Sequence, residues 1–170
     1  GEGRIAGLWA PNIYTAEERM NAVPLCSGKD ADAIVPGNVI VRDEFLRANP
    51  DMVARYLAVF LRGIAFMKAN RDATIQSMNR FYQAGGVTVS EAALRAEIDR
   101  RPIFDLDEQI QLMARAGGPS QADRWYEGLS AFLAQVGTVQ NPPAPSAYLT
   151  DDVLRRIAAD ARLRAFALGQ

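Results

Sequence analysis

The stretch Gly7-Leu8-Trp9-Ala10-Pro11-Asn12 is the most informative segment of this sequence. Small and apolar residues that end in Trp-x-Pro are typical of a buried strand that stops at an opening, because proline cannot donate to a β-ladder and biases the residue before it toward extended geometry. About thirty residues later, the β-branched run Asn38-Val39-Ile40-Val41-Arg42 favours another strand. With a short apolar run between them, strands are expected at residues 4–10, 23–26 and 38–42.

Beyond residue 48 the pattern changes to a series of helices. Asn49-Pro50-Asp51 combines a capping residue, a proline at the first helical position and an acidic residue in the first turn, so it predicts a helix start. Apolar residues follow at helical spacing: Val53, Tyr56, Leu57, Phe60, Leu61 and Ile64. Further helices are expected to start near residues 70, 90, 107, 120 and 150, with a short one at 15–21. Capping-box patterns at Thr15 and Ser120 mark two of these starts.

Composition excludes several classes of function. The 170 residues carry a net charge of −1, so no basic excess exists to attract nucleic acid. There is one cysteine, Cys26, and no histidine. An internal disulfide, a Cys/His zinc site and a histidine-dependent nucleophile are therefore all impossible within this sequence. No apolar run approaches the length of a transmembrane helix.

Few side chains stand out as chemical candidates. The acidic residues Asp105, Asp107 and Glu108, like Asp151 and Asp152, fall at expected helix starts, where the helix dipole favours negative charge, so no catalytic role is assigned to them. Lys29, in the polar turn 27–30, could line an anion site or be solvated, and the second interpretation is favoured. Trp9 could project into a cleft with Asn12, or it could lie in the core before an ordinary turn.

The order of these segments resembles the second half of a substrate-binding protein of the nitrate/sulfonate/taurine/thiamine-precursor (NitT/TauT) class of ABC importers. The resemblance rests on residues 9–12, 37–45, 49–57 and 99–102, on the proline-rich connector 138–148 and on the helix start at 150–152. It covers nearly the whole chain. The break at Gly117-Gly118-Pro119 departs from the family pattern.

The resemblance implies an α/β fold of the type 2 periplasmic-binding-protein kind, with this chain as a mostly helical C-terminal portion that keeps a few strands. Residues 1–48 would form the strand-containing part of the lobe and hinge region. Residues 49–170 would form a helical portion that packs on the lobes. The chain would then be a fragment of a two-lobe protein, and its partner would be the missing N-terminal half or a second copy of itself.

The function implied by the resemblance is solute capture between two lobes and delivery to an ABC permease in the inner membrane. The solute would be small and anionic or heteroaromatic, and the location periplasmic or otherwise extracytoplasmic. Trp9, Asn12 and Arg101 are the expected ligand-binding residues. No catalytic residue, metal, cofactor or nucleic-acid partner is expected, so the chain is not expected to be an enzyme.

Two alternatives remain open. The helical stripes could bury against a partner chain, which would make the chain a protein-interaction module without a small-molecule ligand. The predicted strands argue against this alternative, and a lack of β-structure would favour it. The other alternative is an enzyme on the same scaffold that works with carboxylates alone, such as a hydrolase.

Overall fold

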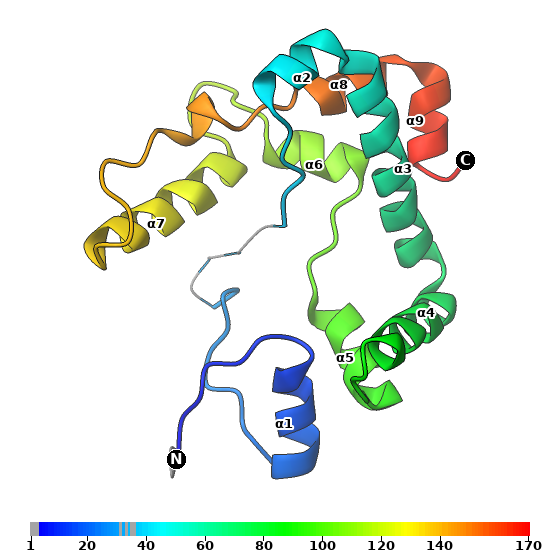
Figure 1. The fold of residues 1–170 in the computed structure, drawn as a ribbon, viewed down its shortest axis with the longest axis vertical. Coiled ribbons are helices and arrows are strands. Elements are labelled where there is room, and N and C mark those ends of the chain that lie inside the picture. The colour runs from blue at the N-terminus through cyan, green and yellow to red at the C-terminus, as the bar shows by residue number, and fades with distance from the viewer. Residues whose placement is uncertain (1–3, 31, 33, 35–36) are drawn as a thin grey trace. The chain divides into compact units, whose positions relative to one another are not determined.

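The computed structural model describes residues 4–30, 32, 34 and 37–170 (Figure 1). The chain divides into two compact units, which are described separately. The first contains the residues up to 25 together with 66–103, and the second contains 26–65 together with 104–170.

The first unit is built from three helices: α1 (Asn12–Met20), α4 (Arg71–Ala84) and α5 (Glu91–Arg100). α4 and α5 pack side by side, and α1 packs against α5 (Figure 1). The buried core of this unit is formed by Ile75, Val89, Ala93 and Leu94. Ser90 begins α5 as expected, because its hydroxyl oxygen accepts a hydrogen bond from the Ala93 N–H at 3.1 Å.

The second unit contains the remaining helices: α2 (Asp43–Ala48), α3 (Pro50–Ala69, up to residue 65), α6 (Leu106–Leu112), α7 (Gln121–Gln135), the 3₁₀ turn η1 (Pro145–Ala147), α8 (Asp152–Ala159) and α9 (Ala161–Ala167). α8 packs on both α6 and α9. The core consists of apolar side chains from α3, α6, α8 and α9: Ala54, Ala58, Leu61, Leu106, Leu154, Ile157 and Ala167. One face of α3 therefore supplies much of this core.

Local helix signals predicted most of these starts. The capping box at Ser120 is confirmed, since Ser120 and Asp123 satisfy each other's backbone N–H groups. The prediction of a capping box at Thr15 is wrong. α1 begins at Asn12, and the Thr15 hydroxyl donates to the Pro11 carbonyl at 3.4 Å. α3 begins at Pro50 as expected, whereas the side chain of Asn70 donates to the Phe66 carbonyl and closes α3 instead of capping α4.

The prediction of an α/β fold with a few strands is wrong for this chain. Residues 4–10, 23–26 and 38–42 contain no strand, and the described part of the chain is helical apart from its connections. A strand needs a neighbour, because its backbone groups bond to another strand and not within the segment. Across the described residues, no backbone hydrogen bond joins residues 4–8, 23–26 or 38–41 to another segment. Residues 38–42 do contain β-branched side chains, but the described residues include no strand with which they could pair.

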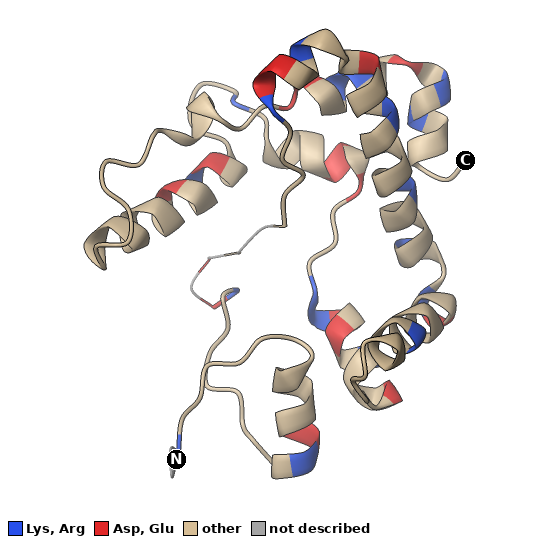
Figure 2. Ribbon diagram, in the orientation of Figure 1, with Lys and Arg blue, Asp and Glu red and all other residues tan. Residues whose placement is uncertain are grey.

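The division at residue 48, between a lobe-and-hinge part and a helical part, stays a prediction about a longer protein. Residues 1–3, 31, 33, 35 and 36 of the range 1–48 lie outside the described residues. Acidic and basic residues are mixed along most of the helices (Figure 2). Residues 128–150 carry no charged side chain at all, which leaves the second half of α7 and the connector after it uncharged. Within the described residues, no helix meets the length and apolarity needed to cross a bilayer.

Candidate functional site

The turn before α1 displays the predicted ligand-binding residues Trp9 and Asn12. The Trp9 carbonyl accepts a hydrogen bond from the Ile13 N–H at 3.2 Å, and the Pro11 carbonyl accepts from Tyr14 and Thr15 at 3.1 and 3.2 Å. This arrangement holds the backbone while the indole of Trp9 remains 73% exposed. Asn12 is the first residue of α1 and is also exposed. Trp9 is therefore not a core residue of this chain, and its ring is free to stack on a ligand.

Arg101, the other predicted ligand-binding residue, lies at the C-terminal end of α5. Its guanidinium donates to a carboxylate oxygen of Glu97, one helical turn earlier, and half of its side chain remains exposed. Glu97 itself is only 1% exposed. The Tyr82 hydroxyl donates to the second carboxylate oxygen of Glu97 at 3.1 Å. A buried carboxylate is thus satisfied by one cation and one phenol, as its burial requires.

Tyr14 and Arg100 extend this arrangement to α1. The Arg100 guanidinium carbon lies 5.3 Å from the centre of the Tyr14 ring, and one of its nitrogens donates to both Glu17 oxygens at 2.7 and 2.8 Å. Burial, reinforced by the Glu97 carboxylate, raises the pKa of Tyr14 above its ordinary value, and the same two causes raise the pKa of Tyr82. We call Tyr14, Tyr82, Glu97, Arg100 and Arg101 the Glu97 cluster.

The Glu97 cluster brings the predicted site residues into one unit without joining them directly. Tyr14 follows Asn12 by two positions on α1, and Arg101 ends the helix against which α1 packs. Across the described residues, no hydrogen bond or ion pair links Arg101 to Trp9 or Asn12. Half of the Arg101 side chain and most of the Trp9 ring remain exposed to solvent. The Tyr82–Glu97 hydrogen bond links α4 to α5, and the contact of Arg100 with Tyr14 links α5 to α1.

Sequence reasoning missed Glu97, although a signal was present. Glu97 lies three residues after Leu94 and one before Ile98, on the inward-facing stripe of its helix. A carboxylate on an apolar stripe marks a position where a buried charge must find partners. Arg101 lies four residues further on, at the spacing of a helical ion pair. The two positions together could have predicted the core of the cluster.

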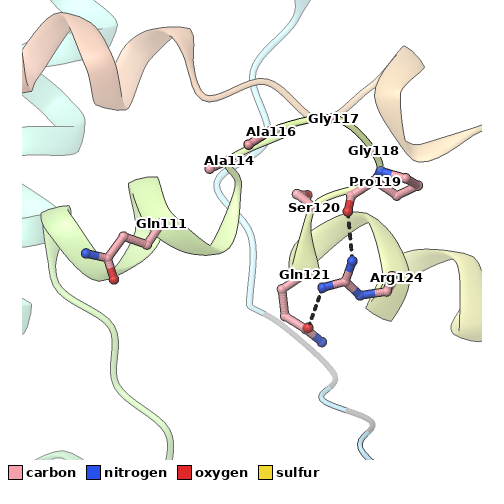
Figure 3. A pocket seen from close by; sticks show the side chains of 9 residues that line it. All are labelled: Gln111, Ala114, Ala116, Gly117, Gly118, Pro119, Ser120, Gln121 and Arg124. Carbon is pink, nitrogen blue, oxygen red and sulfur yellow. Dashed lines mark hydrogen bonds between the residues drawn. The ribbon is translucent and has the colours of Figure 1, made fainter.

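The second unit contains an open depression of about 410 Å³ at the loop between α6 and α7 (Figure 3). The one charged side chain that lines it, Arg124, is already engaged by its neighbours. The Arg124 guanidinium donates to the Pro119 carbonyl and to the Gln121 side-chain oxygen, both at 2.8 Å. Trp9, Asn12 and Arg101 do not line it. We assign no ligand to this depression.

The α7 N-terminus beside this depression is also self-satisfied. Asp123 accepts two hydrogen bonds from Arg115 at 2.8 Å and two from Ser120 at 2.8 Å. These hydrogen bonds, those from Arg115 above all, hold the pKa of Asp123 far below its usual range. The Asp123 carboxylate therefore has a structural role: it caps the first turn of α7 and forms an ion pair with Arg115.

Other candidate positions carry little chemistry. Asp30 accepts hydrogen bonds from the Ser27 N–H at 2.6 Å and the Ser27 hydroxyl at 2.7 Å, which lower the pKa of Asp30. The turn that carries Lys29 is therefore held by its own residues, and it is exposed. Within the described residues, no group of three or more acidic or sulfur-bearing side chains is placed to hold a metal ion.

Comparisons with known proteins give relatives but no family. No family model matches the chain, and no solved structure matches it. A Brucella abortus (strain 2308) protein, provisionally named a binding protein, is 27% identical over 150 residues, which is 86% of this chain and 44% of the relative. A similarly named protein of Brucella suis biovar 1 gives the same figures.

A further relative from Bacillus subtilis (strain 168), provisionally named an aliphatic sulfonates-binding protein, is 31% identical over 65 residues. That match covers 38% of this chain and 20% of the relative. This chain is thus similar, over most of its own length, to proteins named as binding proteins, and it spans less than half the length of the Brucella relatives.

Proposed function

We propose that this chain is part of the solute-binding component of an ABC importer of the NitT/TauT class. The observation that carries the proposal is the similarity over 86% of the chain to a protein named as a binding protein. The shorter match to an aliphatic sulfonates-binding protein points to the same class of importer. The residue pattern of the sequence supports it independently.

The solute is small and anionic or heteroaromatic. The exposed Trp9 indole offers a face on which a planar ring can stack, and the half-exposed Arg101 guanidinium offers N–H donors that suit a sulfonate or carboxylate. Asn12 adds an amide that can donate or accept. Binding pockets of this kind combine apolar surface with a few polar groups that fix orientation.

The mechanism in this proposal is transport, with no chemical step. Solute would favour the closed arrangement of two lobes, and the closed form would be the one recognised by the permease in the inner membrane. Solute capture and delivery would take place in the periplasm or an equivalent extracytoplasmic space. The polypeptide that completes the cleft would be contributed by the part of the protein outside this sequence.

A second candidate is a helical protein-interaction module without a small-molecule ligand. One observation favours it: no strand is present in the described ranges, 4–30, 32, 34 and 37–170. Several large apolar side chains in these ranges are exposed, among them Trp9, Ile40 and Tyr56. In this alternative the exposed indole would contact a protein partner instead of a solute.

A thermal-shift titration separates the two candidates. The full-length protein that contains this sequence is titrated with nitrate, taurine, longer alkanesulfonates, aromatic carboxylates and pyrimidines. A solute present at about a hundred times its Kd stabilises the folded state by about 2.7 kcal/mol, which raises the Tm visibly.

Substitutions of the two tryptophans provide the internal control. The Trp9→Ala variant is expected to lose most of the shift, whereas Trp125→Phe, which alters an indole stacked on Phe104, is expected to keep it. If no solute of the panel raises the Tm of the unsubstituted protein, the transport proposal fails and the interaction module becomes the better account.

A further inference from the structure

Helix α3 is apolar on two opposite faces, and only one of them is covered. The inner face supplies Val53, Ala54, Ala58 and Leu61, which are buried. The outer face carries Met52, Tyr56, Val59 and Phe60, each half exposed or more. We call these four residues, together with Gly63, the outer stripe of α3. Their spacing of three and four positions places them along one line of the helix.

A helix that is apolar around most of its circumference belongs in the interior of a larger structure. Only a narrow strip of α3 in this unit is charged, with Asp51, Arg55 and Arg62 on it, and Asp51 is already paired with Arg156. Gly63 continues the outer stripe, and a Cβ added to it would meet no atom within 4 Å. The space above the stripe is therefore open in this chain, and a small residue at this place lets another backbone approach closely.

We propose that the outer stripe of α3 is the docking surface for the polypeptide that binding proteins of the relatives' length carry outside the matched region. This inference rests on the proposed function, because it takes the chain as part of a longer binding protein. The Brucella relative has more than half of its length outside the region that this chain matches. The outer stripe is apolar, leaves space above Gly63 and is flanked on one side by the charged strip. A surface of this kind is expected where α3 packs against another part of the same protein, with the charged strip at the border of the contact.

A second copy of this chain fits the stripe less well. In a two-fold symmetric pair with antiparallel α3 helices, the same surface of each copy forms the contact. The charged strips of the two α3 helices, which include Arg55, would then lie next to each other. Like charges placed in this way are destabilising. A different polypeptide can cover the outer stripe without bringing a second basic strip next to Arg55.

Cysteine labelling tests the docking surface. Phe60→Cys and, as a matched control from the charged strip of the same helix, Arg55→Cys are each made with Cys26→Ser, which removes the exposed native thiol. Maleimide labelling rates are then measured in this chain alone and in the full-length protein that contains it. Tyr56→Cys provides a second position on the stripe, and circular dichroism verifies that each variant is folded.

In this chain alone, the stripe and control positions are expected to label at similar rates. In the full-length protein, labelling of F60C and Y56C is expected to slow by about tenfold or more, because access then requires opening of the interface, while R55C stays near its original rate. Rapid labelling of F60C and Y56C in the full-length protein would overturn the inference, as would a reading frame no longer than this sequence.

Two further outcomes also overturn it. Protection of the stripe already in this chain alone would show that no further polypeptide is needed. If that protection depends on concentration, the occupant is a second copy. The labelling does not depend on solute, so a full-length protein that protects the stripe but binds no solute would refute the transport proposal and leave the docking surface standing.

Discussion

Residues 4–25 and residues 152–168 both carry a large apolar side chain at about every third position, yet only the second stretch contains fully buried ones. Ile5, Trp9, Val23 and Leu25 are exposed, whereas Leu154, Ile157 and Ala167 are core residues of the second unit. Helices α8 and α9 satisfy their own backbone groups, so they need only a neighbouring surface. Extended segments need partners for their backbone as well as for their side chains. The comparison shows that apolar content alone does not determine burial.

The largest expected effect comes from truncating a buried side chain of the C-terminal stretch. Ile157 is 0% exposed and Ile5 is 79% exposed. Ile157→Ala is expected to lower the free energy of unfolding by about 2–5 kcal/mol, since it removes buried methylene groups and leaves a cavity. Ile5→Ala, the same chemical change, is expected to stay within about 0.5 kcal/mol. Urea unfolding followed by circular dichroism measures both, and equal losses would show that the segment around Ile5 is packed in solution.

A polar interaction is expected to stabilise the second unit almost as much as an apolar contact. Asp123 is nearly buried and accepts from Arg115 and Ser120. Asp123→Asn removes the charge and leaves the Arg115 guanidinium without its anion, so a loss of about 2–3 kcal/mol is expected at pH 7. Urea unfolding of the variant at pH 7 measures this loss.

The pH dependence of the Asp123 contribution has a definite sign. The pKa of Asp123 is lower in the folded state than its ordinary value of 3.8. Its stabilising effect is therefore complete above that ordinary value and is lost progressively as the pH falls below it. Between pH 7 and pH 3 the unfolding curves of both proteins should draw closer without meeting, because the folded-state pKa lies far below 3.8 and the rest of the effect is lost only at lower pH. A constant gap between the two proteins would mean that the carboxylate charge is not what stabilises the fold.

A more exposed ion pair in the C-terminal stretch is expected to contribute less. Arg164 on α9 donates to both oxygens of Asp107 at 2.7 and 2.8 Å, and both side chains remain well over a third exposed. Arg164→Met keeps an apolar side chain of similar length and is expected to cost at most about 1 kcal/mol, because solvent screens the pair. Arg164 holds the pKa of Asp107 below its usual range, so this small contribution too disappears as the pH falls below about 4. A loss above 2 kcal/mol in urea would show that solvent does not screen the pair with Asp107, because methionine keeps the apolar stem.

Local signals were enough to predict most of the helices, and they failed where the partner lies elsewhere in space. Ser90 and Ser120 mark the starts of their helices in the sequence, because each hydroxyl accepts a hydrogen bond from the backbone N–H only three residues later. Asp105 and Glu108 form another capping box that the same rule could have found. Asp160, which accepts from Arg162 and Leu163, likewise starts α9 in a tail for which no helix was predicted.

The strands could not be judged in this way, because pairing depends on a second segment. The candidate site shows the same limit. Arg101 was singled out from its own position, but the carboxylate that binds it, Glu97, became visible only when helical spacing and burial were considered together. The ligand-binding roles of Trp9, Asn12 and Arg101 stay predictions.

The smallest expected effect on stability belongs to the residue with the largest expected effect on binding. Trp9→Ala removes an indole that is 73% exposed and whose backbone carbonyl, not its ring, holds the first turn of α1. The free energy of unfolding is therefore expected to change by less than about 0.5 kcal/mol in urea. A loss of 3 kcal/mol or more, as for a buried aromatic ring, would place Trp9 in a core and remove the reason to regard it as a ligand contact. An unchanged stability, combined with a lost response to solute, would instead separate the function of the N-terminal stretch from the packing of the C-terminal one.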